Sequence, residues 1–139
     1  VGSSAALGQA MMGEPYVAGV VDQWRDLTVV LAGIGSLEPS PLLLQSGNTL
    51  PEPDLAELRA LGAVGDICLR FFDADGRPVR SDLDGRVVGI GAETLKAVPR
   101  RVGVAGGARK HTAIRAAVLG GWINVLVTDA ATAEAVLAT

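Results

Sequence analysis

The sequence predicts an α/β fold: an open, mostly parallel sheet with flanking helices and a small antiparallel hairpin excursion. Short apolar runs alternate with helical patterns, and the last part of the chain reads strand, helix, strand, helix. That order favours parallel pairing with right-handed crossovers. Glycine is abundant, at 18 of 139 residues, which suits buried strands joined to helices by tight turns. Asp75-Gly76 lies between the stretches "ICLRFFDA" and "RPVRS", as in a hairpin.

Length and composition limit the class of protein. With 139 residues, 49% of them hydrophobic, the chain is long enough to form one domain with its own core. A net charge of -3 gives no general attraction to nucleic acid or to an anionic membrane, and no apolar run approaches the ~20 residues that cross a bilayer. The single cysteine, Cys68, cannot form an internal disulfide, so we expect a cytoplasmic protein with Cys68 in the core.

The first half of the chain is expected to hold three helices and one buried strand. The helices are predicted over residues 6–12, 15–26 and 54–61, and the strand, rich in β-branched residues, over 27–35. Val17, Val20, Val21 and Trp24 would share one face of the second helix. Residues 36–53 hold four of the seven prolines and are predicted to form a long loop of the kind that often carries function.

The second half begins with the hairpin excursion and ends with the alternating elements. Strands over 67–74 and 77–81 would flank the Asp75-Gly76 turn. A helix over 92–98 must end before Pro99. Further elements are predicted as a strand over 101–105, a helix over 108–121, a strand over 122–128 and a helix over 129–138, with Asp129 as its N-cap.

The stretch "VAGGARKHT" is the strongest candidate for a binding site. Gly106 and Gly107 would turn the backbone at the carboxyl end of a strand, where ligands sit in open α/β sheets. Arg109 and Lys110 then fall where the helix already carries partial positive charge. Backbone amides and an ammonium group could therefore converge on a phosphate. Two tolerated surface cations are the alternative, because each costs only ~0.3–1 kcal/mol there.

A second glycine turn, Gly33 to Ser36, follows the predicted strand over 27–35. It contains Gly33 and Gly35, and Ser36 and Ser40 are nearby hydroxyl donors. The turn lacks the third glycine of a dinucleotide fingerprint, and neither glycine stretch has the spacing of a P-loop. It is therefore predicted to border a pocket rather than to bind a nucleotide.

Asp66 is the third candidate, because it opens an apolar run where an isolated carboxylate is costly. It could accept hydrogen bonds from sugar hydroxyls, or instead cap the preceding turn or pair with Arg70. His111, the single histidine, is predicted to face solvent rather than to act in catalysis. No spacing of metal ligands and no nucleophile motif is found, so neither a metal, a cofactor nor a catalytic residue is predicted.

Four stretches together resemble a known family. They are "VVLAGIGSLEPSPLL", "LRALGAVGDICLRFFDADGRPV", "RVVGI" and "RVGVAGGARKHTAIRAAVLGGWINVLVTDAATAEAVL". In this order they resemble the second half of the effector-binding domain of SorC-type (DeoR-like) transcriptional regulators, which are sugar-responsive bacterial proteins. The resemblance implies a fold related to ribose-5-phosphate isomerase and glucosamine-6-phosphate deaminase, and a phosphorylated sugar as effector.

The resemblance also assigns roles to residues. It implies that Lys110 lies near a phosphate or another ligand oxygen, that Asp66 hydrogen-bonds the sugar, and that the turn from Gly33 to Ser36 borders the same pocket. Residues 1–139 would then form part of a sugar-phosphate effector-binding domain. The helix-turn-helix and the first half of the family's effector domain are not found, so operator DNA would be contacted only through an N-terminal domain outside this chain.

Three functions are consistent with the sequence. The first is a non-enzymatic sensor of a phosphorylated sugar that works as a homo-oligomer, a dimer or tetramer, and switches an attached DNA-binding domain. The second is a sugar-phosphate isomerase or deaminase of the same fold, for which Asp66 is the one base we would nominate. The third is an oligomerisation scaffold with a vestigial pocket.

Overall fold

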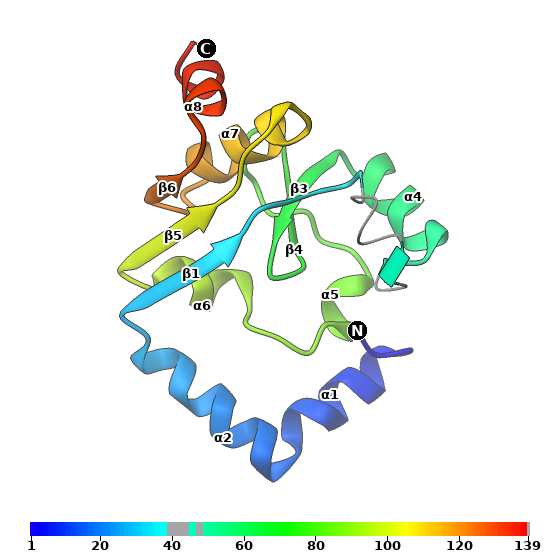
Figure 1. The fold of residues 1–139 in the computed structure, drawn as a ribbon. Helices are drawn as coiled ribbons and strands as arrows, with labels where there is room; N and C mark the ends of the chain where they lie inside the picture. Colours follow the sequence, from blue (N-terminus) through cyan, green and yellow to red (C-terminus); the bar gives the residue numbers. More distant parts are fainter. Residues whose placement is uncertain (39–44, 47–48, 139) are drawn as a thin grey trace.

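The computed structural model describes residues 1–38, 45–46 and 49–138 (Figure 1). Its helices are α1 (Ala5–Gly13), α2 (Pro15–Gln23), α4 (Glu52–Ala60), α5 (Leu83–Arg86), α6 (Ala92–Ala97), α7 (His111–Leu119) and α8 (Ala130–Leu137), with 3-10 turns η1 (Trp24–Asp26) and η2 (Ala108–Lys110). Its strands are β1 (Val29–Gly33), β2 (Gly35–Ser36), β3 (Ala63–Ile67), β4 (Arg70–Asp73), β5 (Arg100–Val104) and β6 (Val125–Val127). The α/β class predicted from the sequence is confirmed.

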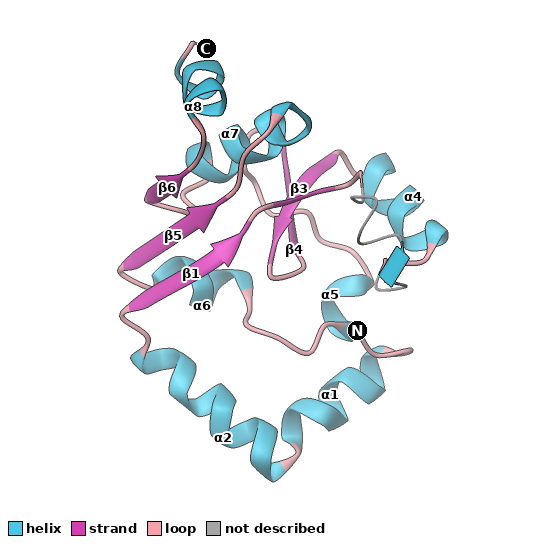
Figure 2. Ribbon diagram, in the orientation of Figure 1, coloured by secondary structure: helices cyan, strands magenta, loops and turns pink. Residues whose placement is uncertain are grey.

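Sheet A is the predicted parallel sheet, in the order β1-β5-β6 (Figure 2). Leu31 of β1 is in register with Val102 of β5, which is in register with Val125 of β6. The crossover between β5 and β6 contains α7, and α8 follows β6. The alternation of strand and helix in the sequence therefore predicted both the direction and the order of these two strands.

Sheet B is antiparallel, in the order β2-β3-β4. Its first strand continues the chain of β1, so the single strand predicted over 27–35 is two strands in different sheets. The chain leaves sheet A at Gly33 and enters sheet B at Gly35, and Ile34 between them is buried at 1% exposure. The two glycines thus flank a buried anchor at the point where the sheets separate.

The hairpin excursion has one turn more than predicted. Cys68 and Leu69 adopt left-handed backbone conformations, with φ of 53° and 59°, and join β3 to β4. Such a turn matches the twist of antiparallel strands but usually contains glycine or asparagine, so residue type does not indicate a turn here. The prediction of one continuous strand over 67–74 is therefore wrong. The prediction that Cys68 lies in the core is also wrong, because Cys68 is exposed. The reversal at Asp75-Gly76 is confirmed.

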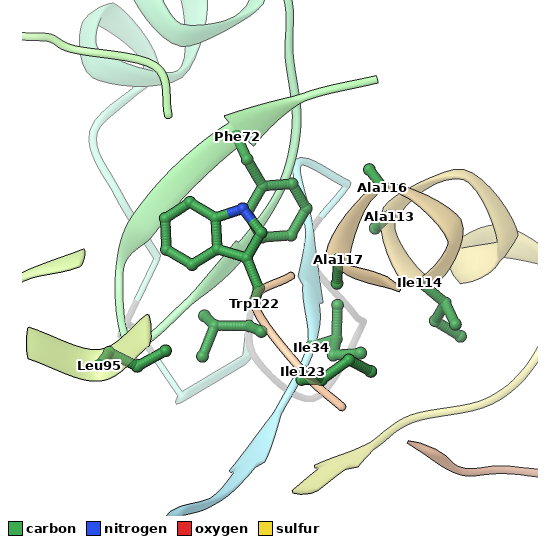
Figure 3. Packing of buried hydrophobic residues seen from close by; sticks show 10 residues of the cluster. Ile34, Phe72, Leu95, Ala113, Ile114, Ala116, Ala117, Trp122 and Ile123 are labelled. Atoms are coloured by element: carbon green, nitrogen blue, oxygen red, sulfur yellow. The ribbon is translucent and has the colours of Figure 1, made fainter. Parts of the chain in front are cut away.

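The main core is formed by residues of α6, α7 and sheet B together with Trp122 and Ile123, and partly buried residues of sheet A pack against it (Figure 3). The ring of Trp122 is fully buried against Phe72, with 5.1 Å between the ring centroids, and Trp122 Nε1 donates a hydrogen bond to the Gly76 carbonyl at 2.8 Å. A Cβ added to Gly120 would lie 2.2 Å from the same Gly76 oxygen. The Asp75-Gly76 turn is therefore in backbone contact with the end of α7.

Helix α2 does not bury the apolar face predicted for it. None of its residues is buried, and Val20 is 55% exposed. Within the described parts of the chain, no helix is both long and apolar enough to span a membrane.

Arg70 ties sheet B to the segment that leads into α6. Its side chain is 10% exposed, and its guanidinium donates to the carbonyls of Ile90 at 2.8 Å, Gly89 at 3.1 Å and Asp84 at 3.1 Å. It also forms an ion pair with the Asp84 carboxylate at 3.3 Å. Because the charge is paired and the donors are used, this arginine can be buried at little cost.

We expect Arg70→Ala to destabilise the protein by about 3 kcal/mol or more, because it leaves a partly buried carboxylate and several carbonyls without a partner. The free energy of unfolding in urea measures this. Arg80→Ala is the matched control: Arg80 pairs with Glu93 at 3.7 Å on the surface, and its loss should cost no more than about 0.5 kcal/mol. Equal losses for the two variants would contradict the structural role given to Arg70.

Candidate functional site

A cleft of about 710 Å³ lies between sheet B, α4, α5 and the N-terminal segment. Its polar lining residues are Ser3, Ser36, Thr49, Asp66 and Arg86, and its apolar ones include Leu37, Leu50, Leu55, Leu69 and Phe71. Two of the predicted site residues, Ser36 and Asp66, therefore share one cleft. Ser40, which we named beside them, lies outside the described residues.

Gly35 and Asp66 are paired across β2 and β3. A Cβ added to Gly35 would lie 1.9 Å from Asp66 Oδ1, so the carboxylate occupies the space that a side chain would need. The other oxygen, Oδ2, accepts a hydrogen bond from the Leu69 amide at 3.0 Å. Asp66 therefore caps the turn that follows it, not the preceding one, and the alternative of a pair with Arg70 is wrong because Arg70 pairs with Asp84.

The environment of Asp66 raises the pKa of its carboxyl. Burial raises the pKa of the Asp66 carboxyl above its ordinary value, while the hydrogen bond from Leu69 and the positive charge of Lys110 lower the pKa in part. A carboxyl with a raised pKa in a cleft is typical of functional sites.

Lys110 reaches the place where the two sheets separate. Its Nζ donates a hydrogen bond to the Ile34 carbonyl at 2.7 Å, and the residue is half-buried. The neighbouring Arg109 is exposed. Lys110 thus approaches the turn from Gly33 to Ser36 and the Asp66 carboxylate, although it does not itself line the cleft.

Gly106 and Gly107 face another carboxylate. The Gly107 amide donates to Asp129 Oδ2 at 3.0 Å and to Thr132 Oγ1 at 2.9 Å. Hydrogen bonds from the Thr132 hydroxyl and amide lower the pKa of Asp129. Asp129, the predicted N-cap of α8, thus also provides a negative charge at the glycine turn. The turn is not part of the cleft lining.

His111 belongs to this second cluster. Its Nε2 lies 3.3 Å from the hydroxyl of Thr132, which is fully buried and donates to Asp129 Oδ2 at 2.7 Å. His111 is therefore half-buried and hydrogen-bonded, not fully solvent-facing as predicted.

Arg86 is a charged lining residue that sequence reasoning missed. Its guanidinium binds the Asp54 carboxylate through two bonds of 2.9 and 3.1 Å, and its Nε donates to the Gly2 carbonyl at 3.1 Å. Asp54 raises the pKa of Arg86 further. The partners lie 32 and 84 positions away, so no local pattern could have indicated the contact.

No group of three or more metal-ligating side chains occurs among residues 1–38, 45–46 and 49–138.

The raised pKa of Asp66 predicts a pH-dependent loss of stability. The folded state holds this proton more tightly than the unfolded state, so stability should fall as the pH rises from about 3.9, the ordinary value for aspartate, through the higher folded value. Asp66→Asn should remove that fall and be the more stable protein near neutral pH.

Urea unfolding of both proteins between about pH 3 and about pH 8 measures the difference. Asp22→Asn, at an exposed carboxylate, is the control and should follow the wild-type profile. A constant difference between wild type and Asp66→Asn at every pH would contradict the burial effect.

The sequence and the fold of this chain match those of a known protein family. The family model described as "Putative sugar-binding domain" matches residues 1–138. The transcriptional regulator LsrR of Klebsiella pneumoniae is 38% identical over 139 residues, which cover 98% of this chain and 43% of LsrR.

Solved structures of transcriptional regulators have the same fold as this chain. The full-length sorbitol operon regulator SorC of Klebsiella pneumoniae superposes with a TM-score of 0.87 at 28% identity, covering 97% of this chain and 44% of SorC. A sugar-binding domain of a transcriptional repressor from Vibrio fischeri gives a TM-score of 0.85 at 31% identity, covering 99% of this chain and 55% of that domain. This chain spans about half or less of the proteins that it matches. It belongs to the sugar-binding domains of SorC/DeoR-like transcriptional regulators.

Proposed function

We propose that the cleft binds a phosphorylated sugar and that this binding, without catalysis, regulates a transcriptional regulator. The observation that carries the proposal is Asp66, a desolvated carboxylate that lines a cleft in a sugar-binding domain. A buried carboxylate is costly unless polar groups meet it. Sugar hydroxyls are donors that would meet it.

Asp66 and Ser36 would hold the sugar. Oδ2 of Asp66 is bound to the Leu69 amide, and Oδ1 lies over Gly35, where an added hydroxyl donor can reach the carboxylate from the cleft. Ser36 Oγ donates to the Glu38 carbonyl at 3.1 Å and keeps lone pairs for a ligand hydroxyl. The apolar side of the cleft would contact the C–H faces of the sugar.

Lys110 would supply the positive charge for the phosphate. Its ammonium group donates to the Ile34 carbonyl, its one acceptor among the described residues, and has three protons to donate. In this proposal Gly33 and Gly35 border the ligand through their backbone. Gly106 and Gly107 shape the turn that carries Lys110, while the Gly107 amide stays bonded to Asp129.

A sugar-phosphate isomerase or deaminase is the second candidate. Such an enzyme needs a base beside the proton that it removes. Asp66, whose pKa is raised, is the one Asp or Glu among the described residues that line the cleft. Turnover of a sugar phosphate that Asp66→Asn abolishes would favour this enzyme. The names of the relatives, LsrR and SorC, are those of regulators and favour the sensor.

The regulator would act in the cytoplasm as a homo-oligomer. Operator DNA would be bound by a domain outside this chain, since this chain matches only the C-terminal part of its relatives. Regulators that read two half-sites need paired subunits, so an effector could act by changing how two copies are arranged.

Isothermal titration calorimetry against a panel of pentose and hexose phosphates tests the sensor. We expect saturable binding of one member of the panel and weaker binding of its unphosphorylated sugar. Lys110→Ala should weaken binding of the sugar phosphate by about tenfold or more, because one charge-assisted hydrogen bond contributes that much to affinity. Arg109→Ala is the matched control, because Arg109 is an exposed cation one residue away, and it should bind normally.

Two results would count against the sensor. Equal affinity of Lys110→Ala and wild type would remove Lys110 from the site. The absence both of binding and of any rise in thermal stability with every sugar phosphate would instead support the oligomerisation scaffold, because a ligand of the native state must stabilise it.

A further inference from the structure

The turn between β3 and β4 holds two residues in a strained backbone conformation. Cys68 and Leu69 have φ of 53° and 59°, and neither is a glycine. In this left-handed region the β-carbon of an L-residue lies too close to the following carbonyl oxygen. Strained residues persist only where their surroundings fix them, and they are common in parts of proteins that switch conformation. The β3–β4 turn, residues 68 and 69, therefore depends on the groups that hold it.

The strands on either side of the β3–β4 turn are fixed by the rest of the fold. Ile67 is 1% exposed, and Arg70 is held by the hydrogen bonds and the ion pair described above. The two residues are also paired with each other across β3 and β4. Rotation of a single peptide group changes ψ of the residue before it and φ of the residue after it. Rotation of the Cys68–Leu69 peptide can therefore take Leu69 out of the left-handed region while both strands stay in place.

Asp66 holds this peptide in its present orientation. Its Oδ2 accepts a hydrogen bond from the Leu69 amide at 3.0 Å, and rotation of the peptide would break that bond. The same carboxyl group lines the cleft, and its Oδ1 occupies the space that a side chain at Gly35 would need. The group that secures the strained turn is thus the group that the proposed ligand would contact.

Leu69 connects the cleft to a second cavity. The residue is half-buried, and it lines both the cleft and an apolar groove of about 520 Å³. The groove is also lined by Trp24, Val29 and Cys68. A change of φ at Leu69 would move its side chain and would therefore change the walls of both cavities together.

We propose that the β3–β4 turn is a conformational switch that transmits ligand binding at Asp66 to the groove. A sugar hydroxyl that donates to Asp66 draws the carboxylate toward the cleft and away from the Leu69 amide. The Cys68–Leu69 peptide then rotates, because the strain at Leu69 is relieved and Asp66 serves the ligand in the rotated state alone. This inference deepens the proposed function and rests on it, because the trigger is a ligand in the cleft.

Cys68 allows a direct test, because it is the single cysteine of the chain and is exposed in the turn. A trifluoromethyl label on its thiol reports the conformation of the turn by fluorine NMR. Without ligand, Asp66→Ala should shift the signal, because it leaves the Leu69 amide without its acceptor. Asp66→Asn is the matched control and should keep the wild-type signal, since asparagine also lacks the charge but retains an acceptor oxygen. Equal spectra for the two variants would overturn the proposal.

The sugar phosphates of the calorimetric panel, beginning with ribose-5-phosphate and glucose-6-phosphate, test the ligand step on the wild-type chain. The member that binds should move the Cys68 signal toward its position in Asp66→Ala. Leu119→Cys with Cys68→Ser carries the same label on an exposed residue of α7 and should show no shift. Calorimetric binding without a shift at Cys68 would overturn the switch alone. The absence of binding by the whole panel would overturn the proposed function and, with it, the ligand trigger.

The strain itself can be measured without a ligand. Cys68→Gly removes the β-carbon that meets the following carbonyl, so its urea midpoint should exceed that of Cys68→Ser by about 0.5 M. Cys68→Ser is the matched control, because serine is close to cysteine in size and keeps the β-carbon. Equal midpoints would show that the turn stores no strain and would also overturn the proposal.

Discussion

The passage of the chain from sheet A to sheet B through Gly33, Ile34 and Gly35 is the constraint on which the candidate site depends. Ile34 fixes the crossing in the core, and its carbonyl receives the Lys110 ammonium. The absence of a side chain at Gly35 leaves room for the Asp66 carboxylate. One short stretch thus brings together a cation from the β5–α7 connection and a carboxyl group from β3. The polar groups of the site are set by the path of the backbone between two sheets.

The sequence predicted the features that arise from local pattern. Apolar runs alternating with helices gave the parallel order of β5 and β6, and the Asp129 cap follows from residue type. Features that depend on distant partners could not be predicted. The turn at Cys68 and Leu69 has no local signature, and the pairing of Arg86 with Asp54 joins residues far apart in the chain. Asp66 could be nominated from its apolar neighbours. The hydrogen bond that its Oδ2 accepts from the Leu69 amide could not be predicted.

Three aspartates show how position decides the role of one side chain. Asp84 neutralises the buried Arg70. Asp129 sits at the start of α8 and receives the amide of Gly107, and hydrogen bonds lower its pKa. Asp66 is desolvated, and its pKa is raised. The first two are satisfied by the protein, whereas Asp66 retains capacity for an outside donor. This distinction, rather than charge alone, separates these two structural carboxylates from Asp66, the carboxylate that we propose as a ligand group.

The contact between Gly76 and Gly120 has a consequence for how the molecule opens. Because the two backbones touch, and Trp122 bonds to Gly76, the tip of the β4 hairpin cannot separate from the end of α7 without exposing the largest buried ring. Sheet B and the β5–α7–β6 unit should therefore melt as one cooperative block. Their amide protons would exchange with solvent together, at a rate set by global unfolding.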